Sequence, residues 1–171
     1  VELDPLAATV GDGVLDALIY AGGTWEAGAF TAAYGFEDGP EEDTERVLAV
    51  NLVAPVKLVR RLLPALRRAA NPRVILVGAL SGLDNLASRE VANSASKYGL
   101  RGAAHALRLE VPGIPVTVIN PGNLATAEVE ADIAEGRFGE QVPIPLSDLL
   151  AVMECALALS PAAVATEINL A

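Results

Sequence analysis

Short apolar runs alternate along the chain with longer stretches in which apolar residues recur at helical spacing. The short runs are rich in β-branched residues and predict buried strands at 16–20, 73–78, 115–119 and 168–170. The longer stretches predict helices at 41–69, 93–111 and 147–159. Fully apolar strands that alternate with helices indicate a parallel sheet covered on both faces. Because no linker, repeat or low-complexity segment interrupts the pattern, we expect one α/β domain over residues 1–171.

Residues at the ends of these segments refine the prediction. Acidic residues gather where the first long helix begins, and arginines lie toward its far end, which suits the helix dipole. Within this helix, Pro55 predicts a kink. We expect Ser147 to cap the last helix, and Val1–Asp4 to form the stub of a further strand at the front of the chain.

The charge balance narrows the class of partner. The 171 residues include 12 Lys and Arg against 22 Asp and Glu, which gives a net charge of −10. Such a surface would repel nucleic acids and anionic membranes, which excludes both as partners. The hydrophobic fraction of 52% is enough for a large buried core and excludes a disordered chain.

Cysteine and histidine are too scarce for several kinds of site. A single cysteine, Cys155, excludes a disulfide framework and a cysteine zinc site. A single histidine, His105, argues against a His-rich metal site and a Ser-His-Asp triad, so we expect no metal. No apolar run approaches the length of a membrane span, and no signal-peptide pattern is visible. We therefore expect a reducing, cytoplasmic setting.

The second long helix contains the most distinctive motif. Its residues 93–102 read Asn-Ser-Ala-Ser-Lys-Tyr-Gly-Leu-Arg-Gly, which closely resembles the active-site helix of the short-chain dehydrogenases/reductases, with its usual Tyr-Ser-Ala-Ser-Lys. Further matches to this family follow in the right order and spacing: Tyr20-Ala21-Gly22-Gly23, Val50-Asn51-Leu52, Leu62-Leu63-Pro64, Asn120-Pro121-Gly122 with Thr126, and 160–168. The resemblance implies a Rossmann-like, doubly wound parallel sheet in three layers and a nicotinamide cofactor, NAD or NADP.

The resemblance also assigns roles to individual residues. The family lysine, here Lys97, hydrogen-bonds the nicotinamide ribose and lowers the pKa of a catalytic tyrosine; the family asparagine, here Asn51, holds a water of a proton relay. The positions that the family uses to bind the cofactor are occupied by Asp4, Ala21, Gly22, Gly23, Lys97, Pro121, Gly122 and Thr126. The implied reaction is hydride exchange between the cofactor and a small carbonyl compound or secondary alcohol.

Two catalytic positions depart from the family pattern. The tyrosine position holds Asn93, whose carboxamide does not titrate near neutral pH and can only form hydrogen bonds. The serine position holds Ala79, and Ser81, two residues further on, is the candidate substitute. Tyr98 lies five residues past Asn93, about 140° around the helix, so we expect it to pack rather than to replace the missing phenol.

The Gly-rich phosphate-binding turn of the family is a further departure. In the family this turn follows the first strand, and no such sequence precedes the strand at 16–20. We therefore expect a sheet without its first two βα units, roughly 50–60 residues, and a fragment rather than a naturally short protein. Without those units, the strand that ends at Tyr20 becomes a bare apolar edge.

Two functions follow from this pattern and remain alternatives. The first is an NAD(P)-dependent oxidoreductase that acts on a carbonyl compound or secondary alcohol. The second is a non-catalytic relative retained for cofactor or ligand binding or for oligomer assembly, because Asn93 and Ala79 replace the catalytic pair. In either case the resemblance implies a homodimer or homotetramer that forms through helices 41–69 and 93–110.

Several of these residues also have a purely structural interpretation. Lys97 could be a solvated helix charge, Asn51 a buried structural amide, and Asn93 a helix N-cap. Other conspicuous side chains are expected to have no role in the chemistry: His105 at the surface or an interface, Cys155 in the core, Trp25 in packing, and a solvated acidic face made of Glu128, Glu130, Asp132 and Glu135.

Overall fold

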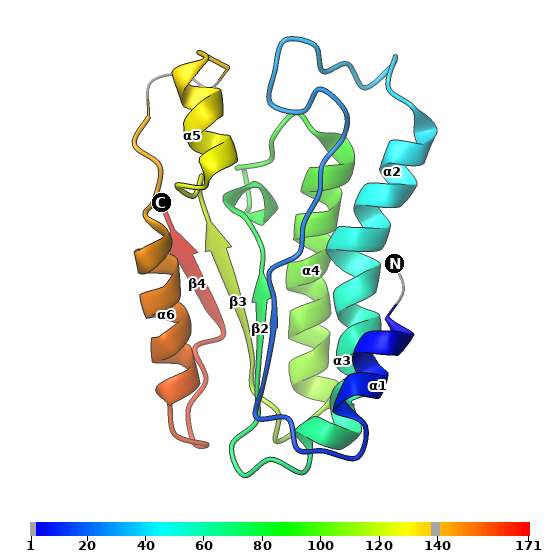
Figure 1. Ribbon diagram of the computed structural model, residues 1–171, viewed down its shortest axis with the longest axis vertical. Coiled ribbons are helices and arrows are strands. Elements are labelled where there is room, and N and C mark those ends of the chain that lie inside the picture. Colours follow the sequence, from blue (N-terminus) through cyan, green and yellow to red (C-terminus); the bar gives the residue numbers. More distant parts are fainter. Residues whose placement is uncertain (1–2, 138–140) are drawn as a thin grey trace.

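The computed structural model describes residues 3–137 and 141–171, and these contain one parallel sheet of four strands (Figure 1). The strands lie in the order β1-β2-β3-β4 and span Ala17–Tyr20, Arg73–Val77, Val116–Pro121 and Glu167–Leu170. Each neighbouring pair is parallel. The four predicted strands are confirmed, with their ends moved by one or two residues.

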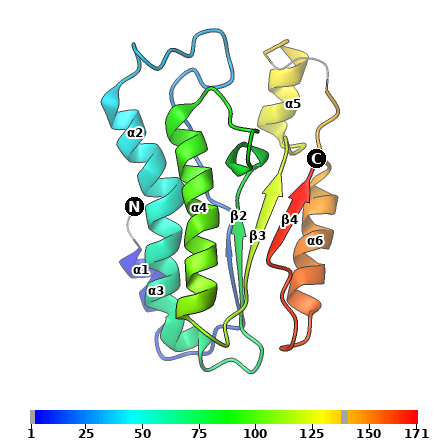
Figure 2. The same ribbon diagram turned by 180° about the vertical axis from the view of Figure 1, so that it is seen from behind.

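Helices cover both faces of this sheet (Figures 1 and 2). Their bounds are α1 Asp4–Val10, α2 Glu41–Leu48, α3 Ala54–Leu66, α4 Val91–Glu110, α5 Ala127–Ala134 and α6 Leu146–Ala158. Helices α3 and α4 cover one face, α6 covers the other, and α5 lies beyond the carboxyl end of β3 (Figure 1). This is the three-layer, Rossmann-like arrangement that the sequence predicts.

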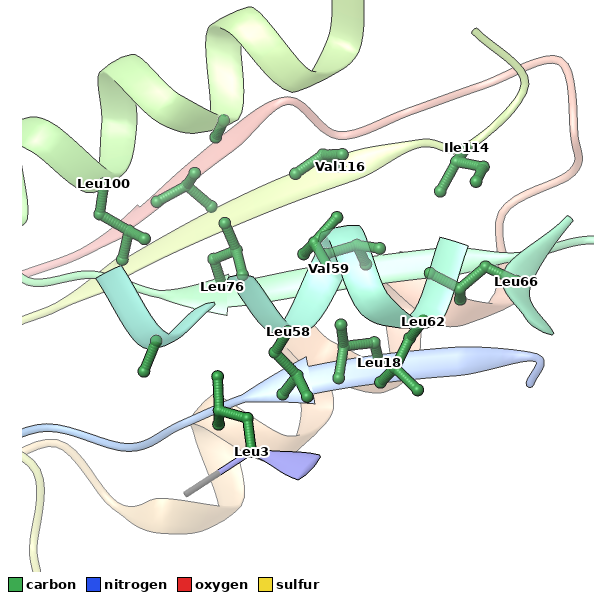
Figure 3. Close-up of a cluster of buried hydrophobic side chains, with 14 residues drawn as sticks. Leu3, Leu18, Leu58, Val59, Leu62, Leu66, Leu76, Leu100, Ile114 and Val116 are labelled. Atoms are coloured by element: carbon green, nitrogen blue, oxygen red, sulfur yellow. The ribbon is translucent and has the colours of Figure 1, made fainter. Parts of the chain in front are cut away.

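Two apolar clusters hold the layers together. The larger joins the sheet to α3 and α4 (Figure 3) and includes Leu18, Val59, Leu76, Leu100 and Val116. The smaller joins the other face of the sheet to α6 and consists of Ile75, Ile119, Leu149, Met153 and Ala156. Alternate residues of β2 and β3 therefore point into different clusters, which is why these two strands are apolar throughout.

The long helix predicted over 41–69 is interrupted next to Pro55. A π-helical segment, Ala49–Val53, joins α2 to α3. Pro55 has no backbone N–H, so it cannot bond the carbonyl of Asn51 four residues before it. The N–H of Ala54 bonds the carbonyl of Ala49, five residues before it. At the predicted kink the helix therefore contains a π turn that ends two residues before the proline, and Asn51 lies in the middle of this turn.

The strand predicted at Val1–Asp4 is wrong for the residues that the structure describes. Asp4 begins helix α1, while residues 1 and 2 lie outside the described ranges. Pro5 occupies the first turn, where its fixed φ is already helical and its missing N–H costs nothing. The Asp4 carboxylate also suits the positive end of a helix dipole. These local signals favour a helix over a strand.

Two predictions about helix caps are also wrong. Helix α4 begins at Val91 with Glu90 at its N-cap, so Asn93 lies inside the first turn and is not a cap. Helix α6 begins at Leu146, so Ser147 is its second residue, and no side chain caps that end. In both cases the helix starts before the polar residue that the sequence offers as a cap.

The predictions for conspicuous single side chains have mixed outcomes. Cys155 is exposed rather than buried, because it lies two residues, about 200°, from Met153 on the buried stripe of α6. His105 is exposed, as expected. The acidic stretch forms a largely solvated face at α5, where Arg137 pairs with Asp132 and Glu135.

Strand β1 forms one edge of the sheet, and its outer side has no partner strand among the described residues. The side chain of Ile19 there is 43% exposed. An apolar groove runs along this edge and is lined by Leu3, Val10, Leu15, Leu18, Leu58 and Leu62, among others. The bare apolar edge expected from the sequence is therefore present, and such an edge is open to pairing with another strand.

Candidate functional site

Segments from four parts of the chain meet at the carboxyl edge of the sheet. The turn after β1 carries Gly22 and Gly23, and the turn after β2 carries Ala79–Gly82. The start of α4 and the π segment with Asn51 complete the group (Figure 1). Because the sheet is parallel, its strand ends share one edge, which is where doubly wound folds bind ligands.

Asn51 is buried, and its amide joins the turn after β1 to α4. Its Oδ1 accepts from the backbone N–H of Thr24 at 2.8 Å, and its Nδ2 donates to the backbone O of Thr24 at 2.8 Å. The same Nδ2 donates to Ser96 Oγ at 3.1 Å and lies 3.5 Å from Asn93 Oδ1. The structural role left open by the sequence is thus present, and it brings Asn51 beside Asn93.

Asn93 and Lys97 lie one turn apart on the same face of α4, as their spacing predicts. Asn93 is buried. Its backbone O accepts a hydrogen bond from Ser96 Oγ at 2.6 Å, and its own side chain offers a carboxamide. The position that carries a tyrosine in the family motif therefore presents a group that binds hydrogen-bond partners and does not ionise.

The ammonium group of Lys97 lies beside Asn51 and the glycine turn. A Cβ placed on Gly23 would lie 3.8 Å from Lys97 Nζ and 3.9 Å from Asn51 Oδ1, so both atoms border the space that the glycine leaves open. Burial lowers the pKa of Lys97 from 10.5 to about 8. Among the described residues no carboxylate forms an ion pair with it. Lys97 is therefore desolvated, and the interpretation as a fully solvated helix charge is wrong.

The turn after β2 packs directly against the Lys97 backbone. Leu80–Gly82 form one turn of 3-10 helix. A Cβ on Gly82 would lie 2.8 Å from the carbonyl carbon of Lys97, so only glycine permits this approach. Ser81 is half-buried in the same turn, and Ala79 precedes the turn in extended conformation. Ser81 is thus next to the residue that approaches α4 most closely, whereas Ala79 supplies only a methyl group.

The remaining predicted cofactor positions fall into two places. Pro121 and Gly122 lie at the end of β3, and Thr126 caps α5 by accepting a backbone N–H at 3.3 Å. These three share the carboxyl edge of the sheet with the glycine turn. Asp4 instead begins α1, and its carboxylate pairs with Arg61 of α3 at 2.9 Å. Among the described residues, Arg61 is the ion-pair partner of Asp4, and the role of Asp4 in cofactor binding stays a prediction.

Two buried carboxylates at the start of α4 were not predicted from the sequence. Glu26 Oε1 accepts from the backbone N–H groups of Ala92 at 2.7 Å and Asn93 at 3.2 Å. Glu90 Oε1 accepts from the backbone N–H of Phe30 at 2.8 Å. Both glutamates are more than nine-tenths buried, and within the described chain Glu26 Oε2 has no hydrogen-bond partner. Glu26 lies 66 and 67 residues before the two N–H groups that it binds, and Glu90, the N-cap of α4, accepts from a residue 60 positions earlier. Because both contacts join distant parts of the chain, no local sequence signal reveals them.

Other candidate side chains lie outside the cluster. The Tyr98 hydroxyl donates to the backbone O of Leu83, and its side chain is partly exposed, so its packing role stays a prediction. Trp25 packs edge-on against Phe30 with ring centroids 5.6 Å apart. Over 3–137 and 141–171, no group of three or more His, Cys, Asp or Glu side chains is placed to hold a metal ion. No helix in that part of the chain combines the length and apolar character needed to cross a membrane.

The amino-acid sequence matches known dehydrogenases over most of its length. Residues 6–136 match the sequence model of the short chain dehydrogenase family. The chain is 40% identical over 89 residues to the short chain dehydrogenase adrF of Penicillium roqueforti, which covers 51% of this chain and 34% of that protein. It is 33% identical over 157 residues to the dehydrogenase/reductase SDR family member 7B of Bos taurus, which covers 82% of this chain and 45% of that protein. The chain spans less than half the length of these curated relatives.

The fold resembles that of solved dehydrogenases at low sequence identity. An alcohol dehydrogenase from the archaeon Thermococcus sibiricus, solved in complex with 5-hydroxy-NADP, superposes with a TM-score of 0.73 at 16% identity. The alignment covers 98% of this chain and 66% of that one. This likeness supports the Rossmann-like arrangement independently of the sequence motifs.

Proposed function

Because the chain belongs to the short-chain dehydrogenase family, we propose that it carries the substrate side of an NAD(P)-dependent oxidoreductase that acts on a small carbonyl compound or secondary alcohol. The observation that carries this proposal is the convergence of Lys97 and Asn51 on the open space at Gly23. Lys97 and Asn51 occupy the lysine and asparagine positions of the family motif. A protein of the same fold holds 5-hydroxy-NADP, which further supports a nicotinamide cofactor.

The residues present fit the nicotinamide ribose end of such a cofactor. The Lys97 ammonium has no carboxylate partner in the described ranges and can donate to ribose hydroxyls. The missing side chain at Gly23 leaves room beside it. When bound, the cofactor supplies or accepts the hydride. The fit concerns this end alone, because the described residues include no Gly-rich turn for the pyrophosphate.

The polar groups of the chain itself bind and orient the reacting oxygen. The Asn93 carboxamide can donate a hydrogen bond to a carbonyl oxygen, and the Ser81 hydroxyl can supply the contact that Ala79 lacks. Lys97, with a pKa of about 8, is the group of this cluster that changes protonation near neutral pH. A proton for the substrate oxygen would therefore come from Lys97 or from a water that it holds.

A second function is favoured by the two departures at the same site. Since Asn93 and Ala79 transfer no proton, the chain could bind cofactor or another small ligand without turnover and serve in assembly. Exposed apolar side chains on α3 and α4, such as Val56 and Leu109, support a homodimer or homotetramer through 41–69 and 93–110.

Cofactor binding and turnover, measured separately, distinguish these functions. NADH and NADPH are titrated into the chain while their fluorescence is followed, and a panel of aldehydes, ketones and secondary alcohols is then assayed for nicotinamide oxidation or reduction. Lys97→Met should weaken binding, whereas the matched variant Lys57→Met, on exposed α3 surface, should not. Binding with turnover supports the oxidoreductase, and binding without turnover supports the non-catalytic relative. Absence of binding by either cofactor would refute the cofactor site.

A further inference from the structure

A small cavity lies where the loop after β1 meets the first turn of α2. Its volume is about 270 Å³, and its described wall comes from the segment 26–44. Asn51, Asn93 and Lys97 are not among the described residues of that wall. The wall combines aromatic and acidic side chains: Tyr34, Phe36, Glu26, Glu37, Glu41 and Asp43. Such a lining favours a ligand that is both apolar and positively charged.

Glu26 contributes a buried and half-satisfied carboxylate to this cavity wall. The residue is only 8% exposed. Its Oε1 accepts from the backbone N–H groups of Ala92 and Asn93 at 2.7 and 3.2 Å, and two such donors at a helix start stabilise a negative charge. Within the described chain, Oε2 has no hydrogen-bond partner. Buried polar atoms are ordinarily hydrogen-bonded, so Oε2 lacks a donor that a ligand in the cavity could supply.

The other carboxylates of the wall leave it negatively charged. Asp43 is paired with Arg46 at 2.7 Å. Glu37 and Glu41 are exposed, and neither forms an ion pair among the described residues. The cavity therefore repels anions and attracts cations. Since no group of three or more His, Cys, Asp or Glu side chains in the described ranges is placed to hold a metal ion, an ammonium group suits these carboxylates better than a metal.

We propose that this cavity binds a small primary ammonium compound with an apolar body. The ammonium group donates a hydrogen bond to Glu26 Oε2, while Glu37 and Glu41 attract its charge. The apolar body packs on the ring of Phe36, which is 64% exposed. The Tyr34 ring is already 6.0 Å from the guanidinium group of Arg89, measured at the ring centroid. The volume of about 270 Å³ is below the usual range for drug-sized ligands, so the ligand is small.

The inference goes beyond the proposed function and does not rest on it. Ammonium binding involves no bond making or breaking and no nicotinamide, so it is tested in the absence of cofactor. A failure to bind the amine would leave the cofactor titrations and their Lys97→Met variant untouched, and a failure to bind cofactor would leave the amine titration untouched.

The test is a titration of the isotope-labelled chain with benzylamine at neutral pH, followed by two-dimensional NMR of the backbone amides. We expect saturable shifts of the Ala92 and Asn93 signals, because both N–H groups bond the Glu26 carboxylate. Benzyl alcohol has nearly the same shape without the charge, and benzyltrimethylammonium has the charge without an N–H donor. Each should bind at least about tenfold more weakly, as expected for the loss of a hydrogen bond to a charged group.

Two variants and one matched control locate the binding at this cavity. Glu26→Gln keeps the shape and an acceptor oxygen but removes the charge, so benzylamine should bind at least about tenfold more weakly. Glu130→Gln removes the same charge from exposed α5 surface and should leave the affinity unchanged. Phe36→Ala, at an exposed position that does not endanger the fold, should weaken binding about two- to fivefold.

Three results would overturn the proposal. The first is the absence of saturable shifts in the native chain, and the second is equal binding of benzylamine and benzyl alcohol; neither requires a variant. The third is equal affinity of the wild-type chain and Glu26→Gln, whose folding the same spectra establish.

Discussion

The two halves of the candidate site differ in what each can do. In one half, which we propose to hold the family asparagine and lysine, Asn51 is hydrogen-bonded to the turn after β1 and Lys97 Nζ lies beside Gly23 of that turn. In the other half, Asn93 and Ala79, which we propose to stand at the tyrosine and serine positions, offer no group that can transfer a proton. Yet α4 carries Asn93 and Lys97 one turn apart on a single face. The residues that orient a reacting group can therefore be in place while the group that transfers the proton is absent.

The largest expected effect comes from restoring the missing half. The double variant Asn93→Tyr with Ala79→Ser places a phenol one turn from Lys97, whose charge lowers a tyrosine pKa. Acid–base assistance contributes about 10²–10⁴ in rate, so we expect turnover of a carbonyl substrate with NADPH or NADH to rise by that factor. Steady-state kinetics on the full substrate panel measure it.

A phenyl group without the hydroxyl is the matched control. Asn93→Phe with Ala79→Ser has nearly the same shape and no acidic proton, so its turnover should stay at the wild-type level. An equal gain in the phenylalanine variant would show that the tyrosine acts by packing. Fast turnover by the wild-type chain would show that Asn93 and Ala79 have not removed the chemistry, and the contrast between the two halves would then disappear.

Removing the Asn51 side chain disrupts the half of the site that contains Asn51 and Lys97. Asn51→Ala deletes both hydrogen bonds to Thr24 and the one to Ser96, and it leaves buried partners unsatisfied. We expect the free energy of unfolding to fall by about 2–4 kcal/mol in urea titrations. Asn123→Ala is the control, since that side chain is exposed and bonds only Gln141 among described residues; its effect should stay within about 0.5 kcal/mol. Equal effects of the two substitutions would mean that the hydrogen bonds of Asn51 do not stabilise the fold.

Much of the fold follows from the sequence because the signals are local. The apolar runs at 73–78 and 115–119 predict strands β2 and β3, whose residues alternate between two clusters and must be apolar on both faces. Pro55 predicts an interruption in the long helix because the missing N–H acts within one turn. The motif at 93–97 likewise locates the site, because residues one turn apart share a helix face.

The features that could not be predicted from the sequence depend on contacts with distant residues or on the exact residue at which a helix begins. Glu26 holds the start of α4 through bonds to Ala92 and Asn93, which are 66 and 67 residues away. Without that contact in view, Asn93 is an attractive N-cap, although the helix begins at Val91. The prediction that Cys155 is buried is wrong for a related reason. Helix α6 has one buried stripe, and packing against the sheet decides which side of the helix faces inward.

The pH dependence of the free energy of unfolding tests the half of the site that contains Asn51 and Lys97. Its pKa is about 8 in the fold and 10.5 in an ordinary lysine, so below about pH 8 both states are protonated and the folded state bears the full desolvation cost. Between about 8 and 10.5 the folded lysine loses its proton first and the cost fades; above 10.5 it is gone. Lys97→Met should therefore raise the free energy of unfolding by about 1–3 kcal/mol at neutral pH relative to its effect at high pH.

Urea titrations of Lys97→Met and wild type across this pH range measure that difference. Lys57→Met, at the exposed lysine, serves as the control and should show no comparable pH dependence. A stabilisation by Lys97→Met that is constant with pH would mean that the methionine gains only packing and that Lys97 is not desolvated. The half of the site that contains Asn51 and Lys97 would then lack the amine of lowered pKa on which its proposed chemistry depends.

The smallest expected effect concerns the contact that positions Asn93. Glu26→Ala removes an acceptor for two N–H groups in the first turn of α4, and loss of such a cap costs about 0.5–2 kcal/mol. Glu26→Gln keeps an acceptor oxygen and should retain most of the stability, whereas Glu130→Ala, on exposed α5 surface, should change little. Amide hydrogen exchange should accelerate at the first turn of α4 and not at Lys97, one turn further in. Equal acceleration at the first turn and at Lys97 would mean that Glu26 stabilises the whole of α4. Loss of this contact would then disturb both halves of the site at once.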